Sequence, residues 1–501
     1  MEKSMIIIGG GLTGLALGCY GRMNGYRTSI FEMHNIAGGV CTGWKRKGYT
    51  IDGAVNWVMG TKPESGYHKF WEEVGAAQQW KIHNHDYFSH IELEGGESFS
   101  FYADVDQLEN YMKGISPEDK EIIEEFTAAI RSTMKIELPV GKPPELYSLL
   151  DKIKMVKMLP FGRLMKKWGN VDIEDFGGRF KNPLLRKVFT GEAFGDVSHL
   201  PMALLIMMFA WFSQKDAGYI IGGALDLVSY IQRRYTDLGG EIHFNSRVEK
   251  ILVENDKAVG IKLADGTEHR ADWIVSAADG RTTIFDMLDS KYIDATIRDY
   301  YDNPRLYPPL IYIGLGVNRR FDDIPSSIGG LSFPLDPPVT ITGKERKRLT
   351  VLIYNFDPTF APEGKTTLIV SLDTDYDYWE ELYKEPERYK VEKEQIADTV
   401  VDLLDKRFPG LAGQVEMRDI ATPMTWVRYT GNWRGSYEGW MMSLESLTTQ
   451  MSKTLPGLEN FYMAGQWVNP GGGIPTAIMS GHHTIQMICK KDKKKFVTST
   501  P

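Results

Sequence analysis

The chain has 501 residues, of which 42% are hydrophobic and 25% charged, as is typical of a globular protein of roughly two to three domains. Its formal net charge of −8 argues against nucleic acid as a partner. Three cysteines without a CxxC pair argue against a disulfide framework, and no apolar run approaches the ~20 residues that cross a bilayer. We therefore expect a cytoplasmic protein, with no signal peptide ahead of its first strand.

A glycine-rich turn joins an apolar strand to a helix at the start of the chain. Residues 5–8 predict a buried strand, residues 12–24 a helix, and residues 27–31 a second strand that ends in Glu32. The turn carries the pattern GxGxxG, which in this strand–helix–strand order indicates a dinucleotide site rather than a turn without a ligand. Glu32 can accept both hydroxyls of an adenosine ribose, which disfavours the 2′-phosphate of NADP.

Each glycine of this turn has an expected task. Gly9 permits the tight turn, Gly11 lets the backbone approach a pyrophosphate, and Gly14 lets the helix pack closely on the strand. The N-terminus of the helix, at Leu12 and Thr13, offers N–H groups and a positive dipole end to the phosphates.

A second glycine pair, Gly38-Gly39, lies close behind the second strand and is followed by Val40. It brings backbone against a ligand that extends past its pyrophosphate, and FAD is such a ligand. We interpret the neighbouring Cys41 as a buried thiol, with a place beside the flavin as the alternative.

Three histidines follow, at positions 83, 85 and 90. Their spacing would place two imidazoles on one strand face, as a metal site requires. We interpret them as satisfied surface histidines instead and expect no metal.

Three later segments have two readings each. Residues 201–212 are apolar all round and rich in methionine, which suits an adaptable hydrophobic channel or a buried core helix. Residues 151–169 interleave lysines with apolar side chains and Trp168, which suits a membrane-surface segment or a solvated amphipathic helix. The basic tail, residues 491–501, suits a membrane-surface contact and a disordered solubilising tail equally well.

Further blocks predict more strands and a terminal helix. Residues 239–251 alternate like a strand, residues 259–267 predict a hairpin, and residues 271–279 predict a buried strand. Near the end of the chain, a strand at 460–465 leads through a glycine-rich loop into a helix over 476–489. The glycines let backbone lie close to a flat ring, and the helix dipole would stabilise charge on a reduced flavin by up to ~2 kcal/mol.

These blocks and their order resemble the bacterial-type phytoene desaturases, a group of glutathione-reductase-like flavoproteins that also contains carotenoid isomerases and retinol saturase-like reductases. The strongest match is the closing signature over residues 464–481, which includes the letters NPGGGIP. Gln466 departs from the acidic residue of many such flavoproteins, and Val40 stands where the family often has arginine. Further matching motifs lie at residues 222–223, 357–364, 376–379 and 421–439.

The resemblance implies an α/β fold, with a glutathione-reductase-like Rossmann domain for FAD and an inserted mixed α+β substrate domain. It implies that Val248 lies near the adenine and Ala278 near the pyrophosphate. The expected ranges are 1–90, 218–290 and 415–490 for the FAD-binding domain, and 91–217 and 291–414 for the substrate domain. The residues expected to bind FAD are Gly9, Gly11, Leu12, Thr13, Gly14, Glu32, Gly38, Gly39, Val40, Val248, Ala278, Gly465, Gly472, Ile474 and Pro475.

The function implied by the resemblance is hydride transfer between flavin N5 and a carbon–carbon bond of an apolar isoprenoid, carotenoid, retinoid or other lipid. The sequence leaves open the direction of transfer, the electron partner and any catalytic acid or base. The alternatives are an amine oxidase-like flavoenzyme acting on a more polar substrate, and a prenyl-binding protein of the GDP-dissociation-inhibitor type without redox chemistry. An apolar substrate also predicts a peripheral membrane contact.

Overall fold

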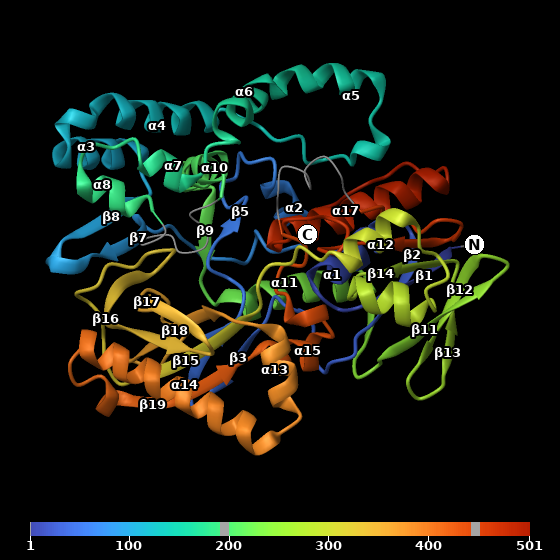
Figure 1. The fold of residues 1–501 in the computed structure, drawn as a ribbon. Helices are drawn as coiled ribbons and strands as arrows, with labels where there is room; N and C mark the ends of the chain where they lie inside the picture. The colour runs from blue at the N-terminus through green and yellow to red at the C-terminus, as the bar shows by residue number, and fades with distance from the viewer. Residues whose placement is uncertain (1, 191–199, 442–450) are drawn as a thin grey trace.

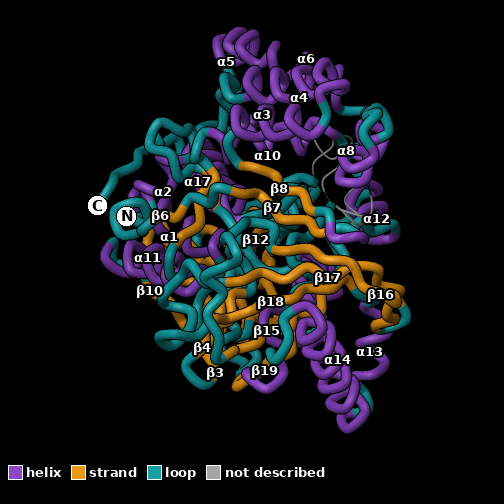
Figure 2. The backbone as a smooth tube through the Cα atoms, turned by 90° about the vertical axis from the view of Figure 1, so that its left-hand side faces the viewer, coloured by secondary structure: helices purple, strands orange, loops and turns teal. Residues whose placement is uncertain are grey.

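The computed structural model describes residues 2–190, 200–441 and 451–501 (Figure 1). Two sheets organise the chain: a five-stranded parallel sheet and a seven-stranded sheet, with a layer of helices beside the second (Figure 2). Within these ranges, every helix is too short or too polar to cross a bilayer.

The parallel sheet assembles strands from three distant parts of the chain, in the order β10–β2–β1–β14–β20. Side chains of β1 alternate between its two faces: Met5 and Ile7 pack against helices, whereas Ile6 and Ile8 pack against a small antiparallel sheet, β11–β13. Both faces are covered, which explains why β1 reads as an unbroken apolar run. The strands are β1 (Lys3–Ile8), β2 (Tyr26–Phe31), β10 (Glu241–His243), β14 (Trp273–Ser276), β20 (Phe461–Met463), β11 (Val248–Glu254), β12 (Lys257–Leu263) and β13 (Glu268–Arg270).

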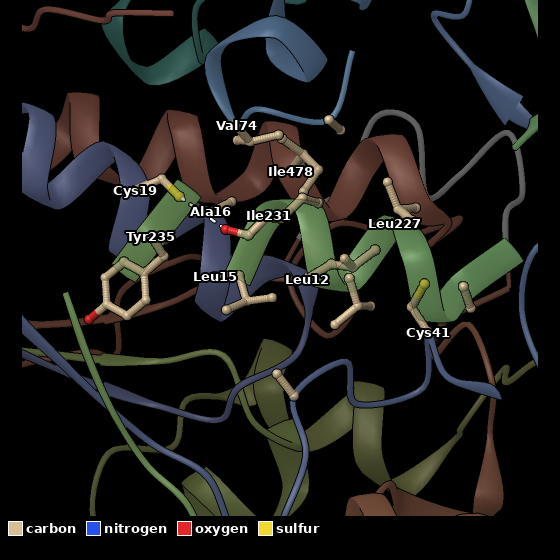
Figure 3. Close-up of a cluster of buried hydrophobic side chains, with 14 of the residues drawn as sticks. Leu12, Leu15, Ala16, Cys19, Cys41, Val74, Leu227, Ile231, Tyr235 and Ile478 are labelled. Carbon is tan, nitrogen blue, oxygen red and sulfur yellow. Dashed lines mark hydrogen bonds between the residues drawn. The ribbon is translucent and has the colours of Figure 1, made fainter. Parts of the chain in front are cut away.

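Helix α1 (Leu12–Met23) lies between α11 (Gly223–Asp237) and α17 (Ile474–Lys491) in this core (Figure 3). Small residues allow the close packing. A Cβ on Gly18 would lie 2.5 Å from the Tyr235 ring of α11, and one on Gly481 of α17 would lie 2.7 Å from the Cβ of Ala16. Most of the strands, helices and the hairpin predicted for the three FAD blocks are present, with ends shifted by a few residues. The single strand expected over residues 239–251 is wrong: it is divided into β10, in the parallel sheet, and β11, in the small antiparallel sheet.

The seven-stranded sheet has the order β19–β15–β18–β17–β16–β7–β8. It includes β7, which spans residue 90, and β19, which begins at residue 415, so it takes in more of the chain than the two ranges expected for the substrate domain. Helix α14 packs on it through an apolar cluster around Trp379 and Val400. The elements are β7 (Tyr87–Glu92), β8 (Ser98–Tyr102), β15 (Leu310–Val317), β16 (Leu331–Ile341), β17 (Lys344–Ile353), β18 (Thr366–Asp373), β19 (Val415–Ala421), α13 (Tyr376–Tyr383) and α14 (Pro386–Arg407).

The helical layer packs on β7 and β8 through a separate aromatic-rich core. In Figures 1 and 2, α5 and α6 lie at its outer edge, away from both sheets. Its helices are α3 (Val105–Ile115), α4 (Lys120–Thr133), α5 (Leu149–Lys154), α6 (Leu159–Trp168), α7 (Ile173–Gly177), α8 (Pro183–Val188) and α10 (Met202–Ser213). The remaining elements are β3 (Gly43–Arg46), β4 (Tyr49–Asp52), β5 (Val58–Met59), α2 (His68–Glu73), β6 (Ile82–His83), β9 (Ala217–Ile220), α12 (Ala295–Asp302) and α15 (Pro423–Thr430).

The basic C-terminal tail is attached to the parallel-sheet core, so its interpretation as a disordered segment is wrong. Val497 exchanges two hydrogen bonds of 2.9 Å with the side chain of Asn24. The ring of Phe496 lies 4.9 Å from that of His482, and the Lys494 ammonium lies 4.0 Å from the centre of the Tyr26 ring. Apolar and cation–π contacts therefore hold a segment whose composition alone indicates solvation.

Candidate functional site

One large cavity lies where the parallel sheet, the seven-stranded sheet and α10 meet. Its volume is about 1230 Å³. This exceeds the roughly 300–1,000 Å³ of an ordinary small-molecule site, so it has room for a dinucleotide and a second ligand. All the residues expected to bind FAD line this cavity except Gly14.

Gly14 lies in the first turn of α1 and does not line the cavity. A Cβ on Gly14 would lie 2.0 Å from the carbonyl oxygen of Gly9, so only glycine allows α1 to start this close to β1. Gly9 has φ +96°, a left-handed conformation that favours glycine. No side chain caps the N-terminus of α1 at Gly11, which leaves its N–H groups to face the cavity.

Glu32 lies at the end of β2 with its carboxylate against the glycine turn. One oxygen accepts a hydrogen bond of 2.6 Å from the Gly10 N–H, and the other accepts one of 2.8 Å from the His34 N–H. Only 6% of Glu32 is exposed, and this burial raises the pKa of its carboxyl. The carboxylate lines the cavity and keeps lone pairs for further donors, but it also anchors the turn itself.

The glycine-rich loop between β20 and α17, residues 464–473, is held in place by a short chain of hydrogen bonds. We call it the closing loop. The Ser480 hydroxyl donates to Asn469 Oδ1 at 2.7 Å and accepts from the Gly465 N–H at 2.8 Å. Gly471, Gly472 and Gly473 all have positive φ, and α17 begins directly after them without a side-chain cap. Glycine backbone and an uncapped helix N-terminus therefore lie along this wall of the cavity.

The far end of the cavity is apolar. Four residues of α10, spaced i, i+3, i+4 and i+7, present one helix face to it: Leu204, Met207, Met208 and Trp211. The opposite face of α10 packs into the helical core. The two readings of residues 201–212, channel wall and core helix, thus each hold for one face. Trp57 adds a second indole, 6.1 Å from that of Trp211.

Glu438 also lines the cavity and is a site residue that the sequence interpretation missed. Burial raises the pKa of its carboxyl to about 7. A signal was present in the sequence, because this acid stands alone among tyrosine, glycine and tryptophan within a family motif. Its relation to the cavity depends on contacts between distant segments, which no local pattern reveals.

The histidines form no metal site. His85 is only 7% exposed, so its interpretation as a surface residue is wrong. His83 and His85 share the Ser326 hydroxyl as a hydrogen-bond partner, and burial lowers the pKa of His85 to about 3. His90 pairs with Ser100 instead. Across the described ranges, no three His, Cys, Asp or Glu side chains are grouped to hold a metal ion.

Cys41 is both buried and part of the cavity wall, so its two readings are compatible. Burial raises the pKa of the Cys41 thiol well above its usual range. It therefore stays a neutral, small apolar side chain at this position.

Comparison with known proteins agrees with this geometry. Residues 12–488 match the family described as "Flavin containing amine oxidoreductase". The chain is 23% identical to a chloroplastic prolycopene isomerase of Daucus carota over 96% of this chain and 79% of the relative. It is 25% identical to a neurosporene-forming phytoene desaturase of Rhodobacter capsulatus, over 96% and 93%. Cyclohexylamine oxidase from Brevibacterium oxydans has a similar fold, with a TM-score of 0.59, 13% identity and coverage of 99% and 100%.

Proposed function

Because the chain belongs to the flavin-containing amine oxidoreductase family and is an FAD-dependent oxidoreductase, we propose that it oxidises or reduces a carbon–carbon bond of a long apolar polyene. The observation that carries this proposal is the apolar wall formed by α10 in the same cavity as the glycine turn. The desaturase and isomerase relatives, named for phytoene and prolycopene, support a carotenoid-like substrate.

The residues proposed to hold FAD follow from the cavity. The turn at Gly9 and Gly11 and the N-terminus of α1 would hold the pyrophosphate, Glu32 the ribose, and the loop around Gly472 the flavin ring, since all of them line the cavity. Bound FAD supplies hydride transfer chemistry, and the protein supplies position and electrostatics. The α10 face and Trp57 hold an apolar chain against the ring and keep water away from it.

Replacing Met207 with aspartate tests the substrate assignment. A carboxylate in this wall would lose its water to the apolar substrate when that substrate binds, so we expect kcat/KM for phytoene or prolycopene to fall by about 100-fold or more, equivalent to roughly 3 kcal/mol. FAD content should stay unchanged. The matched control is Val391→Asp on the exposed side of α14, which should behave as the parent protein.

The measurement is anaerobic bleaching of the bound flavin by each polyene in detergent, with the reverse reaction followed from reduced protein. Cyclohexylamine serves as the polar comparison. Bleaching by the amine and by neither polyene would contradict a polyene substrate and favour the amine oxidase-like alternative.

We also propose a peripheral contact with an anionic membrane, through side chains that only partly coincide with those of the segment 151–169. Trp168 and Leu164, which the basic-apolar pattern offers to a bilayer, are buried in the helical core. The exposed apolar residues lie earlier, on α5 and the turn behind it: Leu149 is 80% exposed, Leu150 70% and Ile153 66%. Val156 continues this surface at 63%, with Lys152 and Lys157 exposed beside it. We call these six residues the α5 surface.

Liposome flotation tests the α5 surface. Each lysine near an anionic surface contributes roughly 1 kcal/mol, and salt screens this part, whereas leucine insertion is not screened. We expect flotation with anionic vesicles at low salt, weaker but still detectable at high salt. A variant with serine at Leu149, Leu150, Ile153 and Val156 should stay unbound, while Val391→Ser should float as the parent does. Absence of flotation of the parent at low salt would refute the membrane contact.

A further inference from the structure

Glu438 lies on a short segment that is packed against the closing loop. The Trp440 carbonyl accepts a hydrogen bond of 3.1 Å from the Gly471 N–H, and the Gly439 carbonyl accepts one of 3.2 Å from the Tyr307 N–H. A Cβ on Gly472 would lie 2.6 Å from the Glu438 carbonyl oxygen, and one on Gly473 would lie 4.0 Å from its carboxyl oxygen Oε1. The carboxyl is therefore adjacent to the loop proposed to hold the flavin ring.

The surroundings of this carboxyl are unusual for a charged residue. Among the described residues it makes no hydrogen bond and no ion pair, although it is partly buried and lines the cavity. The titratable side chains near it are Tyr307 and Tyr437, whose rings lie 5.5 Å apart, and the pKa of Tyr437 is raised by burial and by Glu438. Arg305, on the segment that pairs with this one, is exposed. The closing loop opposite carries no titratable side chain.

A carboxyl in such a place is costly for stability. A buried ionisable group without a partner destabilises the folded state by several kcal/mol when charged, so its presence needs a reason other than packing. Groups of this kind are concentrated at functional sites, where a pKa near the working pH allows a proton to be taken up and released.

We propose that Glu438 accepts a proton when a carbon–carbon single bond of the substrate is oxidised to a double bond, and that it donates this proton when the double bond is reduced. In the desaturation direction, one substrate carbon would transfer a hydride to the flavin, which would thereby be reduced by two electrons. The neighbouring C–H, made acidic by the positive charge that develops, gives its proton to the Glu438 carboxylate. The electron pair of that C–H becomes the new double bond, and Glu438 is left protonated.

The inference rests on the proposed function, and it explains how one site can serve either direction. An apolar wall cannot accept a proton, and neither can the glycine loop. Three carboxyls of the described residues line the cavity, those of Glu32, Asp279 and Glu438. Glu32 and Asp279 each accept hydrogen bonds from two backbone N–H groups, whereas Glu438 accepts none from the residues described.

The test compares the holoenzyme with Glu438→Gln and Glu438→Asp. The first readout needs no substrate: the absorption spectrum of bound FAD is followed from pH 5 to 9, roughly two units either side of neutrality. The parent should show a transition with an apparent pKa of about 7, and Glu438→Gln should lose this transition. The matched control is Glu459→Gln on an exposed turn, which should keep the transition.

The second readout is the rate at which phytoene reduces the bound flavin in a single turnover. The parent rate should rise with pH through the same transition, because the carboxylate is the active form. Glu438→Gln should be slower by roughly 10²- to 10⁴-fold and independent of pH, and Glu438→Asp should recover part of the rate. FAD content must stay equal in all three.

The outcomes distinguish a wrong role for Glu438 from a wrong proposed function. Reduction of the parent by phytoene, with an unchanged rate and pH profile in Glu438→Gln, overturns the role of Glu438 and leaves the proposed function standing. Failure of the parent to react with phytoene or prolycopene overturns the proposed function, and this inference with it. A parent spectrum without a transition between pH 5 and 9 overturns the placement of the carboxyl beside the flavin.

Discussion

Replacing Gly472 with valine should abolish both flavin loading and turnover. The residue has φ +48°, in the left-handed region that a β-branched side chain disfavours strongly. Its Cβ would also lie 2.6 Å from the carbonyl oxygen of Glu438, which is backbone and cannot move aside. The collision is thus with the neighbouring segment of the protein, and relieving it displaces the loop proposed to hold the flavin ring.

The measurement is the ratio of FAD to protein after purification, together with flavin-dependent turnover. Gly457→Val is the matched control, because Gly457 has φ +78° and a Cβ there would meet nothing within 4 Å. Both variants place a β-branched residue at positive φ, and only Gly472→Val carries the steric conflict as well. A Gly472→Val protein with full flavin content and activity would show that the closing loop is placed wrongly.

Replacing Glu32 with alanine should weaken FAD binding by about two orders of magnitude or more. The expected loss is one or two charge-assisted hydrogen bonds to the ribose, at roughly 1.5–3 kcal/mol each. The structure adds a second cost that an exposed ribose contact would not carry. Because the carboxylate accepts from the Gly10 and His34 N–H groups, its removal leaves two backbone donors without these partners and should also lower the thermal stability of the apoprotein.

Dialysis of the holoprotein followed by flavin titration measures the first effect, and thermal unfolding of the apoprotein measures the second. Glu249→Ala is the control, since Glu249 follows the cavity residue Val248 on β11 but is exposed. Unchanged flavin affinity in Glu32→Ala would argue against the ribose role, even if stability falls.

Much of the FAD-binding part could be predicted because its signals are local. A strand, a GxGxxG turn, a helix and an acid follow one another within 32 residues, and each has a fixed geometric task. The same holds for the closing loop, where three consecutive glycines precede a helix. Local patterns of this kind survive in the structure with small shifts at their ends.

The parts that the sequence did not reveal depend on pairing between distant segments. Strand β7 joins β16 some 240 residues further on, by way of the pair His90 and Leu331, and neither strand carries a mark of its partner. Glu438 reaches the cavity because its segment pairs with residues 305–307 and 471. In α6, the apolar positions indicate an amphipathic helix, but only the packing shows that Leu164 and Trp168 face the core.

The order of strands in the parallel sheet has a consequence for biosynthesis. The sheet takes its first strand from the beginning of the chain and its last, β20, from residues 461–463, with α17 following. At roughly 5–20 residues per second, synthesis of the intervening chain takes on the order of 20 to 90 s. During that time α1 lacks its neighbour α17 and the cofactor turn has no closing wall. Flavin can therefore be enclosed only after the residues of α17 have been translated, which ties the cellular yield of holoenzyme to the survival of an open, apolar intermediate on the ribosome.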